Sequence, residues 1–239
     1  MIVKKRAFTG RDIFLDKYMR AEYANPEPNS PLNAKNSMKS RKNQNAAIRR
    51  PEILEGYYNV LIEEGLEGAS LSKIAKKLDI HTSLIFHYFQ SKENLTVELV
   101  ELMIEKFKSI HLLAFDHIED DEERFAALID EIFSLQWSRT VDPGVHFGFY
   151  YQSFRDERTL ERLKKMFAWL KDFLFEQLVS FNSKGIIQVK DEEKAAEYIV
   201  TLMEGLEFHA QFLGNRQPFD KFAETAKKSV IALLKNGYL

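Results

Sequence analysis

The chain has 239 residues, enough for a sizeable hydrophobic core in one large domain or in two smaller ones. Hydrophobic residues make up 45% and charged residues 29%, as in ordinary globular proteins, and no uncharged apolar run is long enough to cross a membrane. Cysteine is absent, which excludes disulfides, thiol catalysis and Cys-based zinc sites and fits a cytoplasmic location.

The charges are unevenly distributed along the chain. Residues 1–50 carry 12 Lys and Arg against 4 Asp and Glu, so the rest must carry a surplus of 10 negative charges to give the net charge of −2. A basic end favours contact with a polyanion, although a basic tail with no such role remains an alternative. A turn-rich run at residues 25–36 reads as a linker, so residues 1–45 are expected to be a basic, partly disordered extension.

From Pro51 onward the pattern is helical, with this proline expected in the first turn of a helix that ends near Gly65 and Gly68. Ser70 is a good N-cap for a second short helix, and Asp79 is expected in the turn that follows it. A third, aromatic helix is expected at residues 82–89, and a longer one begins near residue 91.

These elements have the organisation of a helix-turn-helix, in which two short helices are locked at a steep angle and the second enters the major groove of DNA. Ala75 is the small residue that such a lock requires, and the shared core is expected to comprise Ile74, Leu78, Ile80, Ile85 and Phe89. Helical spacing leaves Thr82, Ser83, Phe86 and His87 on the open face, where they are expected to approach base edges. Lys92 is placed to contact a phosphate.

At this point residues 51–102 resemble the DNA-binding domain of the TetR family of bacterial transcriptional regulators. The resemblance rests on an ordered set of features: Glu64-Gly65, Ser70, Ile74-Ala75, the aromatic run at residues 85–89, and Ser91-Lys92-Glu93-Asn94-Leu95. It implies a sequence-specific DNA-binding regulator that acts as a repressor, with further phosphate contacts from Tyr88 and Lys92 and from Ser70, Ser72 and Lys73.

The sequence departs from the family pattern on the face that touches DNA. Asp79 replaces a common glycine, and Asp tolerates the left-handed conformation that this turn needs. Phe86 replaces a tyrosine whose hydroxyl contacts phosphate in the family, and the basic segment from Lys39 to Arg50 is expected to supply phosphate affinity lost there. The departures leave one alternative open, a protein of this fold that acts as a co-activator or protein-interaction module with weak or lost DNA binding.

Beyond residue 118 the chain repeats amphipathic helical stretches, expected near 121–139, 143–155, 157–182, 192–213 and 219–236, with only a hint of extended chain at 185–189. The predicted fold is therefore all-α: a three-helix DNA-binding domain at residues 46–95, followed by a helical ligand-binding and dimerisation domain at residues 96–239. Neither catalytic motifs nor cofactor loops occur, and no metal site is expected at His111, Asp116 and His117 because their spacing does not share one helical face.

The resemblance places effector binding and homodimerisation in the second domain. Aromatic residues gather there, since 15 of the 19 Phe and both Trp lie beyond residue 100, and most are expected to be core. A small, apolar or amphipathic effector is expected at Trp137, His146, Phe147, Tyr150, Tyr151, Phe154, Trp169 and Phe173. The dimer interface is expected on the last two helices, at Leu202, Gly205, Leu206 and His209.

Overall fold

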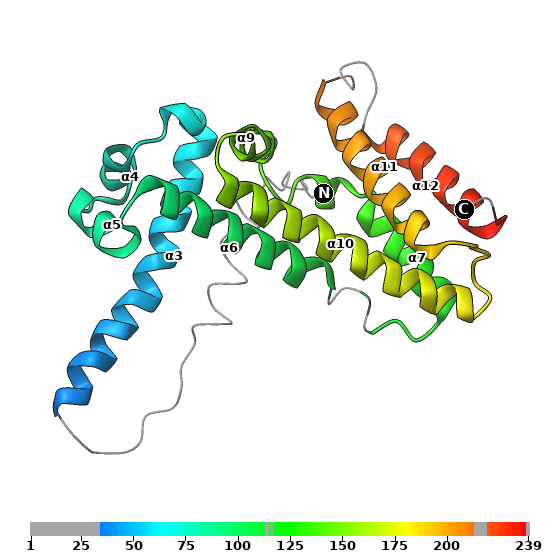
Figure 1. Cartoon of the computed structure of the whole chain (residues 1–239), viewed down its shortest axis with the longest axis horizontal. Coiled ribbons are helices and arrows are strands. Elements are labelled where there is room, and N and C mark those ends of the chain that lie inside the picture. The colour runs from blue at the N-terminus through cyan, green and yellow to red at the C-terminus, as the bar shows by residue number, and fades with distance from the viewer. Residues whose placement is uncertain (1–33, 113–114, 116, 213–218, 238–239) are drawn as a thin grey trace, which may run out of the picture. The chain divides into compact units, whose positions relative to one another are not determined.

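The computed structural model describes residues 34–112, 115, 117–212 and 219–237, and the side chains of all of these except 34–47 and 109–112 (Figure 1). Within this part of the chain every regular element is a helix, which confirms the predicted all-α fold. The helices are α3 (Ala34–Gly68), α4 (Leu71–Leu78), α5 (Thr82–Phe89), α6 (Lys92–Leu112), α7 (Asp121–Ile132), α8 (Leu135–Ser138), α9 (Pro143–Ser153), α10 (Glu157–Ser183), α11 (Glu192–Phe212) and α12 (Phe219–Lys235). None of these helices is long and apolar enough to span a membrane.

The described residues form two compact units whose boundaries differ from the predicted ones. The first contains the chain up to Met103 together with Gly144–Thr159, and the second contains Ile104–Pro143 and Leu160–Leu239. A single cut near residue 95 does not reproduce this division, because α9 belongs to the unit that holds the helix-turn-helix. Hydrophobic periodicity in the sequence predicts where the helices lie, but it does not show which unit each helix packs into.

In the first unit, α4 and α5 are bounded by residues suited to helix ends. The Ser70 side chain accepts a hydrogen bond from the backbone N–H of Lys73 at 3.3 Å, which caps the start of α4. Asp79 ends α4 in the left-handed conformation, with φ 52° and ψ 47°. Ile74 and Ala75 from α4, with Ile85 and Phe89 from α5, are buried as predicted, whereas Leu78 and Ile80 are only half-buried.

Helix α3 begins earlier than predicted, so Pro51 lies inside the helix instead of in its first turn. Residues 34–50 contain no acidic residue and are rich in Lys, Arg and Ala, good helix formers that extend α3 toward the amino terminus. Gly65, with φ 69° and ψ 178°, interrupts the helical backbone three residues before α3 ends at Gly68, and both glycines were predicted to mark this helix end.

The sequence interpretation missed a second small residue in the packing of α3 against α4. A Cβ placed on Gly56 would lie 2.6 to 2.7 Å from three carbon atoms of the Leu78 side chain. Such distances are shorter than van der Waals contact, so any larger residue at position 56 must displace Leu78. Gly56 therefore permits the close approach of α3 to Leu78 of α4.

The second unit is built around one hydrophobic core. Its fully buried residues include Phe133, Leu174, Leu178 and Phe181, and helices α7, α10, α11 and α12 supply most of the others. The predicted helix at 121–139 is divided into α7 and the short α8, because the Ser134 side chain caps a new helix by accepting from the Trp137 N–H at 2.9 Å.

The hint of extended chain at residues 185–189 was wrong, because these residues form a turn and an irregular loop. The Asn182 side chain holds this loop, donating to the Val189 carbonyl at 2.9 Å and accepting from the Val189 N–H at 3.0 Å. Loop backbone groups that would otherwise lack partners are therefore satisfied by one side chain.

Candidate DNA-binding interface

Helix α5 presents the side chains that were expected to read DNA. Ile85 and Phe89 are 0% and 2% exposed, and they anchor one face of the helix in the core of the first unit. Thr82, Ser83, Phe86 and His87 are all exposed on the other side, and Phe86 is 59% exposed. The depression beside this face is lined by Asp79, Ile80, His81, Ser83, Leu84 and His87. This surface offers hydroxyl and imidazole groups that can form hydrogen bonds with base edges.

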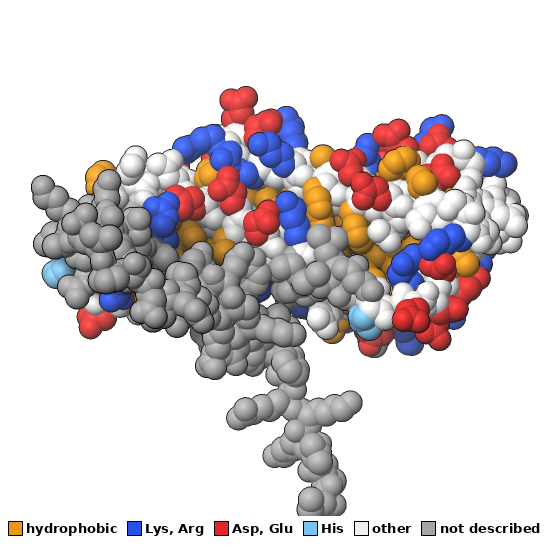
Figure 2. Space-filling model, turned by 90° about the horizontal axis from the view of Figure 1, so that it is seen from below, with side chains coloured by type: hydrophobic (Ala, Val, Ile, Leu, Met, Phe, Trp, Pro, Cys, Tyr) orange, Lys and Arg blue, Asp and Glu red, His pale blue; other side chains and the backbone are white. Residues whose placement is uncertain are grey.

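Two of the predicted phosphate contacts at the start of α4, Ser70 and Lys73, already have partners in the protein. The Ser70 hydroxyl caps the helix, and the Lys73 ammonium forms an ion pair with Glu64 of α3 at 2.8 Å. Lys77 pairs in the same way with Glu63 at 2.6 Å, whereas the Ser72 side chain is exposed. Acidic and basic side chains are likewise intermixed on the part of the described surface that faces the viewer in Figure 2. Because these pairs are exposed, DNA phosphates can compete for the lysines at modest cost.

Lys92, a predicted phosphate contact, binds the end of α3 in this structure. Its ammonium donates a hydrogen bond to the backbone carbonyl of Leu66, in the last turn of α3, at 2.9 Å. Burial lowers the pKa of the Lys92 side chain below its ordinary value, with Glu93 acting in the opposite direction. In this structure Lys92 satisfies a helix-end carbonyl, and a phosphate would have to use its remaining N–H donors.

The basic segment that precedes the helix-turn-helix is part of α3. Arg49 pairs with Glu52 one turn later at 2.7 Å, and both side chains are largely exposed. Arg50 instead donates to the Tyr88 carbonyl at 2.8 Å and to both carboxylate oxygens of Glu98 at 2.5 Å. The sequence interpretation missed the roles of Arg50 and Glu98, because a pairing over 48 residues leaves no periodic signal.

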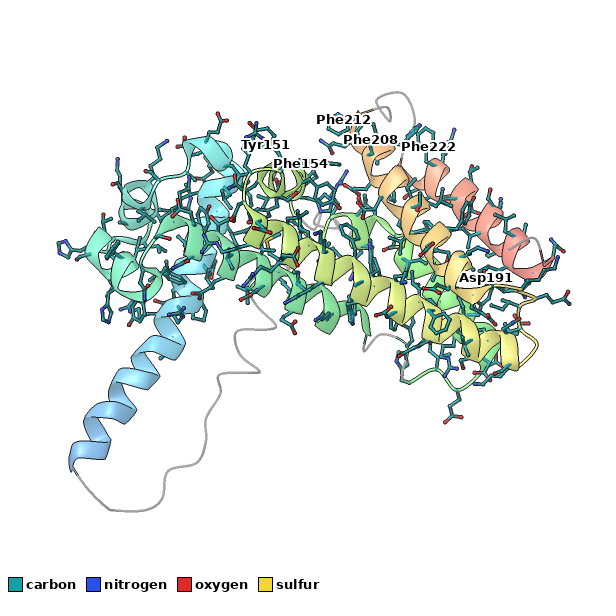
Figure 3. The ribbon with its side chains drawn as sticks, in the orientation of Figure 1. Tyr151, Phe154, Asp191, Phe208, Phe212 and Phe222 are labelled. Atoms are coloured by element: carbon teal, nitrogen blue, oxygen red, sulfur yellow. The ribbon has the colours of Figure 1, made fainter. Side chains whose placement is uncertain are left out.

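The predicted effector residues fall into two groups. On α9, His146, Phe147 and Tyr150 form an aromatic cluster in the first unit, with ring centroids 4.6 to 6.0 Å apart. Tyr151 of the same helix and Phe154, which directly follows it, are 47% and 84% exposed (Figure 3), and the Arg155 guanidinium lies 3.9 Å from the Tyr151 ring centroid. In the second unit, Trp169 and Phe173 stack at 6.0 Å, and Trp137 packs edge-on against Phe107 at 5.4 Å.

Burial also changes the pKa of His146. Its Nε2 atom is buried and has no hydrogen-bond partner within the described part of the chain. Desolvation lowers the pKa of His146 to about 4, so the imidazole is neutral near pH 7. No group of three or more potential metal-binding side chains occurs among the described residues.

The predicted dimer residues on α11 lie at unequal depths. Leu206 is 8% exposed and belongs to the core of the second unit, which corrects its placement on an outer surface. Leu202 is half-buried, and so is His209, whose ring lies 3.9 Å from that of Phe222 on α12. Gly205 is exposed, and a Cβ added to it would meet no atom of this chain within 4 Å.

Two family models match the chain and together span more than half of it. The model described as "Bacterial regulatory proteins, tetR family" matches residues 53–99, which hold the helix-turn-helix. The model described as "Tetracyclin repressor-like, C-terminal domain" matches residues 120–236.

Several individual relatives and solved structures that are similar to the chain are also transcriptional regulators. The HTH-type transcriptional regulator BetI of Rhizobium meliloti is 23% identical over 66% of this chain and 76% of its own length. The HTH-type transcriptional repressor AcnR of Corynebacterium diphtheriae is 39% identical over 57 residues, 24% of this chain and 30% of its own length. A TetR transcription regulator from Haloarcula marismortui superposes with a TM-score of 0.71 at 19% identity, covering 79% of this chain and 99% of that one.

Another similar structure contains a ligand. It is a putative transcriptional regulator from Saccharomonospora viridis in complex with choline, with a TM-score of 0.68 and 16% identity, covering 77% of this chain and 96% of that one. At these identities the structural similarity shows the fold.

Proposed function

Because the chain belongs to the TetR family and is a DNA-binding transcriptional regulator rather than an enzyme, we propose that it is a homodimeric cytoplasmic repressor released from its operator by a small effector. The observation that carries the DNA-binding part is the arrangement of α5. One face is locked in the core by Ile85 and Phe89, and the opposite face exposes Ser83, Phe86 and His87. An α-helix held in this way fits the major groove, where each base pair presents a distinct pattern of donors and acceptors.

The test begins by selecting an operator from random double-stranded DNA with the full chain. His87→Ala is then expected to weaken operator binding by about 10- to 100-fold, as for loss of a base contact, and to leave binding to a scrambled duplex unchanged. His117→Ala is the matched control, since His117 is also exposed but lies in the second unit. Fluorescence anisotropy measures both affinities, and a wild-type protein that selects no sequence would favour the co-activator or protein-interaction alternative.

The effector is a mostly apolar or amphipathic small molecule, and the α9 cluster supports this class. His146 has an unpartnered buried nitrogen beside the Phe147 and Tyr150 rings, and one polar group among aromatic rings can orient an apolar ligand. The exposure of Tyr151 and Phe154 does not favour them as pocket residues. Trp137, Trp169 and Phe173 remain predicted effector contacts.

The choline complex of the Saccharomonospora viridis protein suggests a quaternary ammonium as a competing class. In this chain, however, the Lys108 ammonium already lies 5.5 Å from the Trp169 ring centroid, so a cation occupies one aromatic face that such a ligand would use. Mass spectrometry of small molecules extracted from the protein after purification from its host is expected to find an apolar or amphipathic compound. Recovery of choline or a related cation would contradict the proposed class.

The dimer interface lies on the exposed face of α11. Tyr198, Thr201, Gly205, Phe208 and Phe212 are all exposed and follow one another at three- and four-residue steps, so they form one stripe along the helix. We call these five residues the α11 stripe. The rings of Phe208 and Phe212 also contact each other near the end of the helix, with centroids 4.8 Å apart and planes tilted by 40° (Figure 3). Such an apolar stripe fits a two-fold interface with a second copy, and Gly205 permits close approach.

A further inference from the structure

Arg50 connects three helices of the first unit through one side chain. One guanidinium nitrogen donates to the Tyr88 carbonyl at 2.8 Å, and the other donates to both oxygens of Glu98 on α6 at 2.5 Å. The guanidinium carbon also lies 4.8 Å from the ring centroid of Phe89. Arg50 therefore links α3 to the last turn of α5 and to α6.

The chemistry of the two partners explains why an arginine suits this position. Tyr88 is in the last turn of α5, where carbonyl groups lack partners within the helix and a cation is favoured by the helix dipole. Glu98 is a carboxylate, and both of its oxygens accept from Nη2 of Arg50, which leaves Nη1 to donate to the Tyr88 carbonyl. The planar guanidinium can hold both partners and also stack on an aromatic ring, whereas a lysine ammonium presents a single nitrogen.

The neighbouring Arg49 shows what an arginine here does without these partners. Arg49 forms an ion pair with Glu52 in its own helix, and its side chain is 51% exposed, against 39% for Arg50. Both residues lie in the segment whose positive charge was expected to bind phosphates. The directional contacts of Arg50 to α5 and α6 assign it a different role.

We propose that Arg50 and Glu98 form a clamp that fixes the orientation of α5 against α6, so that Arg50 is a positioning residue for operator reading and not a phosphate contact. The proposal rests on the proposed function, because it concerns how α5 is presented to the major groove. Base-edge contacts require an accurately oriented helix, whereas phosphate contacts supply affinity for any sequence. Loss of the clamp therefore lowers specific binding and leaves non-specific binding intact.

The effect of Glu98→Gln separates the two roles, since this variant removes a negative charge with almost no change of shape. If Arg50 is held by the Glu98 carboxylate, the variant loosens α5 and weakens operator binding. If Arg50 contacts a phosphate, the variant frees it from a competing anion, which strengthens binding and steepens its salt dependence. The two roles therefore predict opposite changes in operator affinity.

Anisotropy titrations over a series of KCl concentrations, with the selected operator and a scrambled duplex, test the clamp in the full chain. Arg50→Met, which keeps an unbranched apolar stem over Phe89, is expected to weaken operator binding about tenfold, and Glu98→Gln about fivefold. Both leave the scrambled-duplex affinity and the salt slope unchanged, and Arg49→Met leaves the ratio of the two affinities unchanged. Stronger binding by Glu98→Gln, or a salt slope reduced by about one unit in Arg50→Met, overturns the proposal.

Amide hydrogen exchange without DNA tests the clamp independently of any operator. Arg50→Met and Glu98→Gln are expected to accelerate exchange in α5 by about tenfold and to leave the α3 amides at residues 53–61 unchanged. Arg49→Met serves as the control and leaves α5 unchanged. If α5 exchange is unaltered in both clamp variants, the clamp proposal is overturned, whether or not the protein recognises DNA. If exchange in α5 accelerates but the protein selects no operator, the clamp stands and only the proposed function has failed.

Discussion

Replacing Phe208 by aspartate is expected to convert the homodimer into monomers and to reduce operator affinity by at least about 100-fold. Phe208 is 53% exposed in the single chain and lies on the α11 stripe, next to Phe212. In a two-fold interface each substitution occurs twice, so two carboxylates would have to be buried without partners at a cost of several kcal/mol each. A monomer then brings only one recognition helix to the operator, and the second half-site no longer contributes.

Sedimentation velocity at micromolar protein measures the dimer, and anisotropy with the selected operator measures the affinity. Phe154→Asp is the matched control, because Phe154 is 84% exposed in the turn after α9 and lies outside the α11 stripe. Gly205→Leu is a second variant, which adds bulk where the chain itself leaves open space. A dimer that survives both α11 variants, or one that dissociates in Phe154→Asp, would place the interface elsewhere.

Short-range patterns were sufficient to predict the helix-turn-helix from the sequence. Ser70 caps α4, Asp79 takes the left-handed turn, and Ile85 and Phe89 anchor α5, because each role depends on residues only a few positions apart. The same local logic separated the exposed face of α5 from its buried face.

Interactions between distant residues were not predictable in this way. Lys92 is predicted to contact a phosphate, but its hydrogen bond to the Leu66 carbonyl, 26 residues earlier in the sequence, was not predicted. Arg50 and Glu98 are 48 residues apart, and Gly56 matters only because Leu78 of another helix packs against it. Charge and size suggest that such residues have a role, but the folded chain decides which partner each one meets.

The dimer prediction shows a related limit for helices that contact neighbours on more than one side. Leu206 and Gly205 are adjacent in the sequence, yet Leu206 packs in the core while Gly205 is exposed. An apolar periodic pattern identifies both the core face and the outer stripe of α11, and the sequence alone does not divide them. The exposed positions of Tyr198 and Phe208 shift the expected interface around the helix.

Lowering the pH from 7 to 5 is expected to destabilise the folded protein through His146 by about 2 kcal/mol. Burial lowers the pKa of this imidazole to about 4, whereas the unfolded chain has the ordinary value of about 6.5. Between these two values the unfolded state binds a proton that the folded state does not. The stability contributed by neutral His146 is therefore complete above pH 6.5 and is lost as the pH falls through this window.

Urea unfolding of the wild type and of His146→Gln at pH 7 and pH 5 isolates this contribution, because carboxylates that also titrate are common to both proteins. The wild type should lose about 2 kcal/mol more than His146→Gln between the two pH values, and His117→Gln, altered at an exposed histidine, should behave as the wild type. Equal losses in all three proteins would mean that His146 is solvated or paired in solution. Its Nε2 atom would then already have the hydrogen-bond partner that the proposed effector is expected to supply.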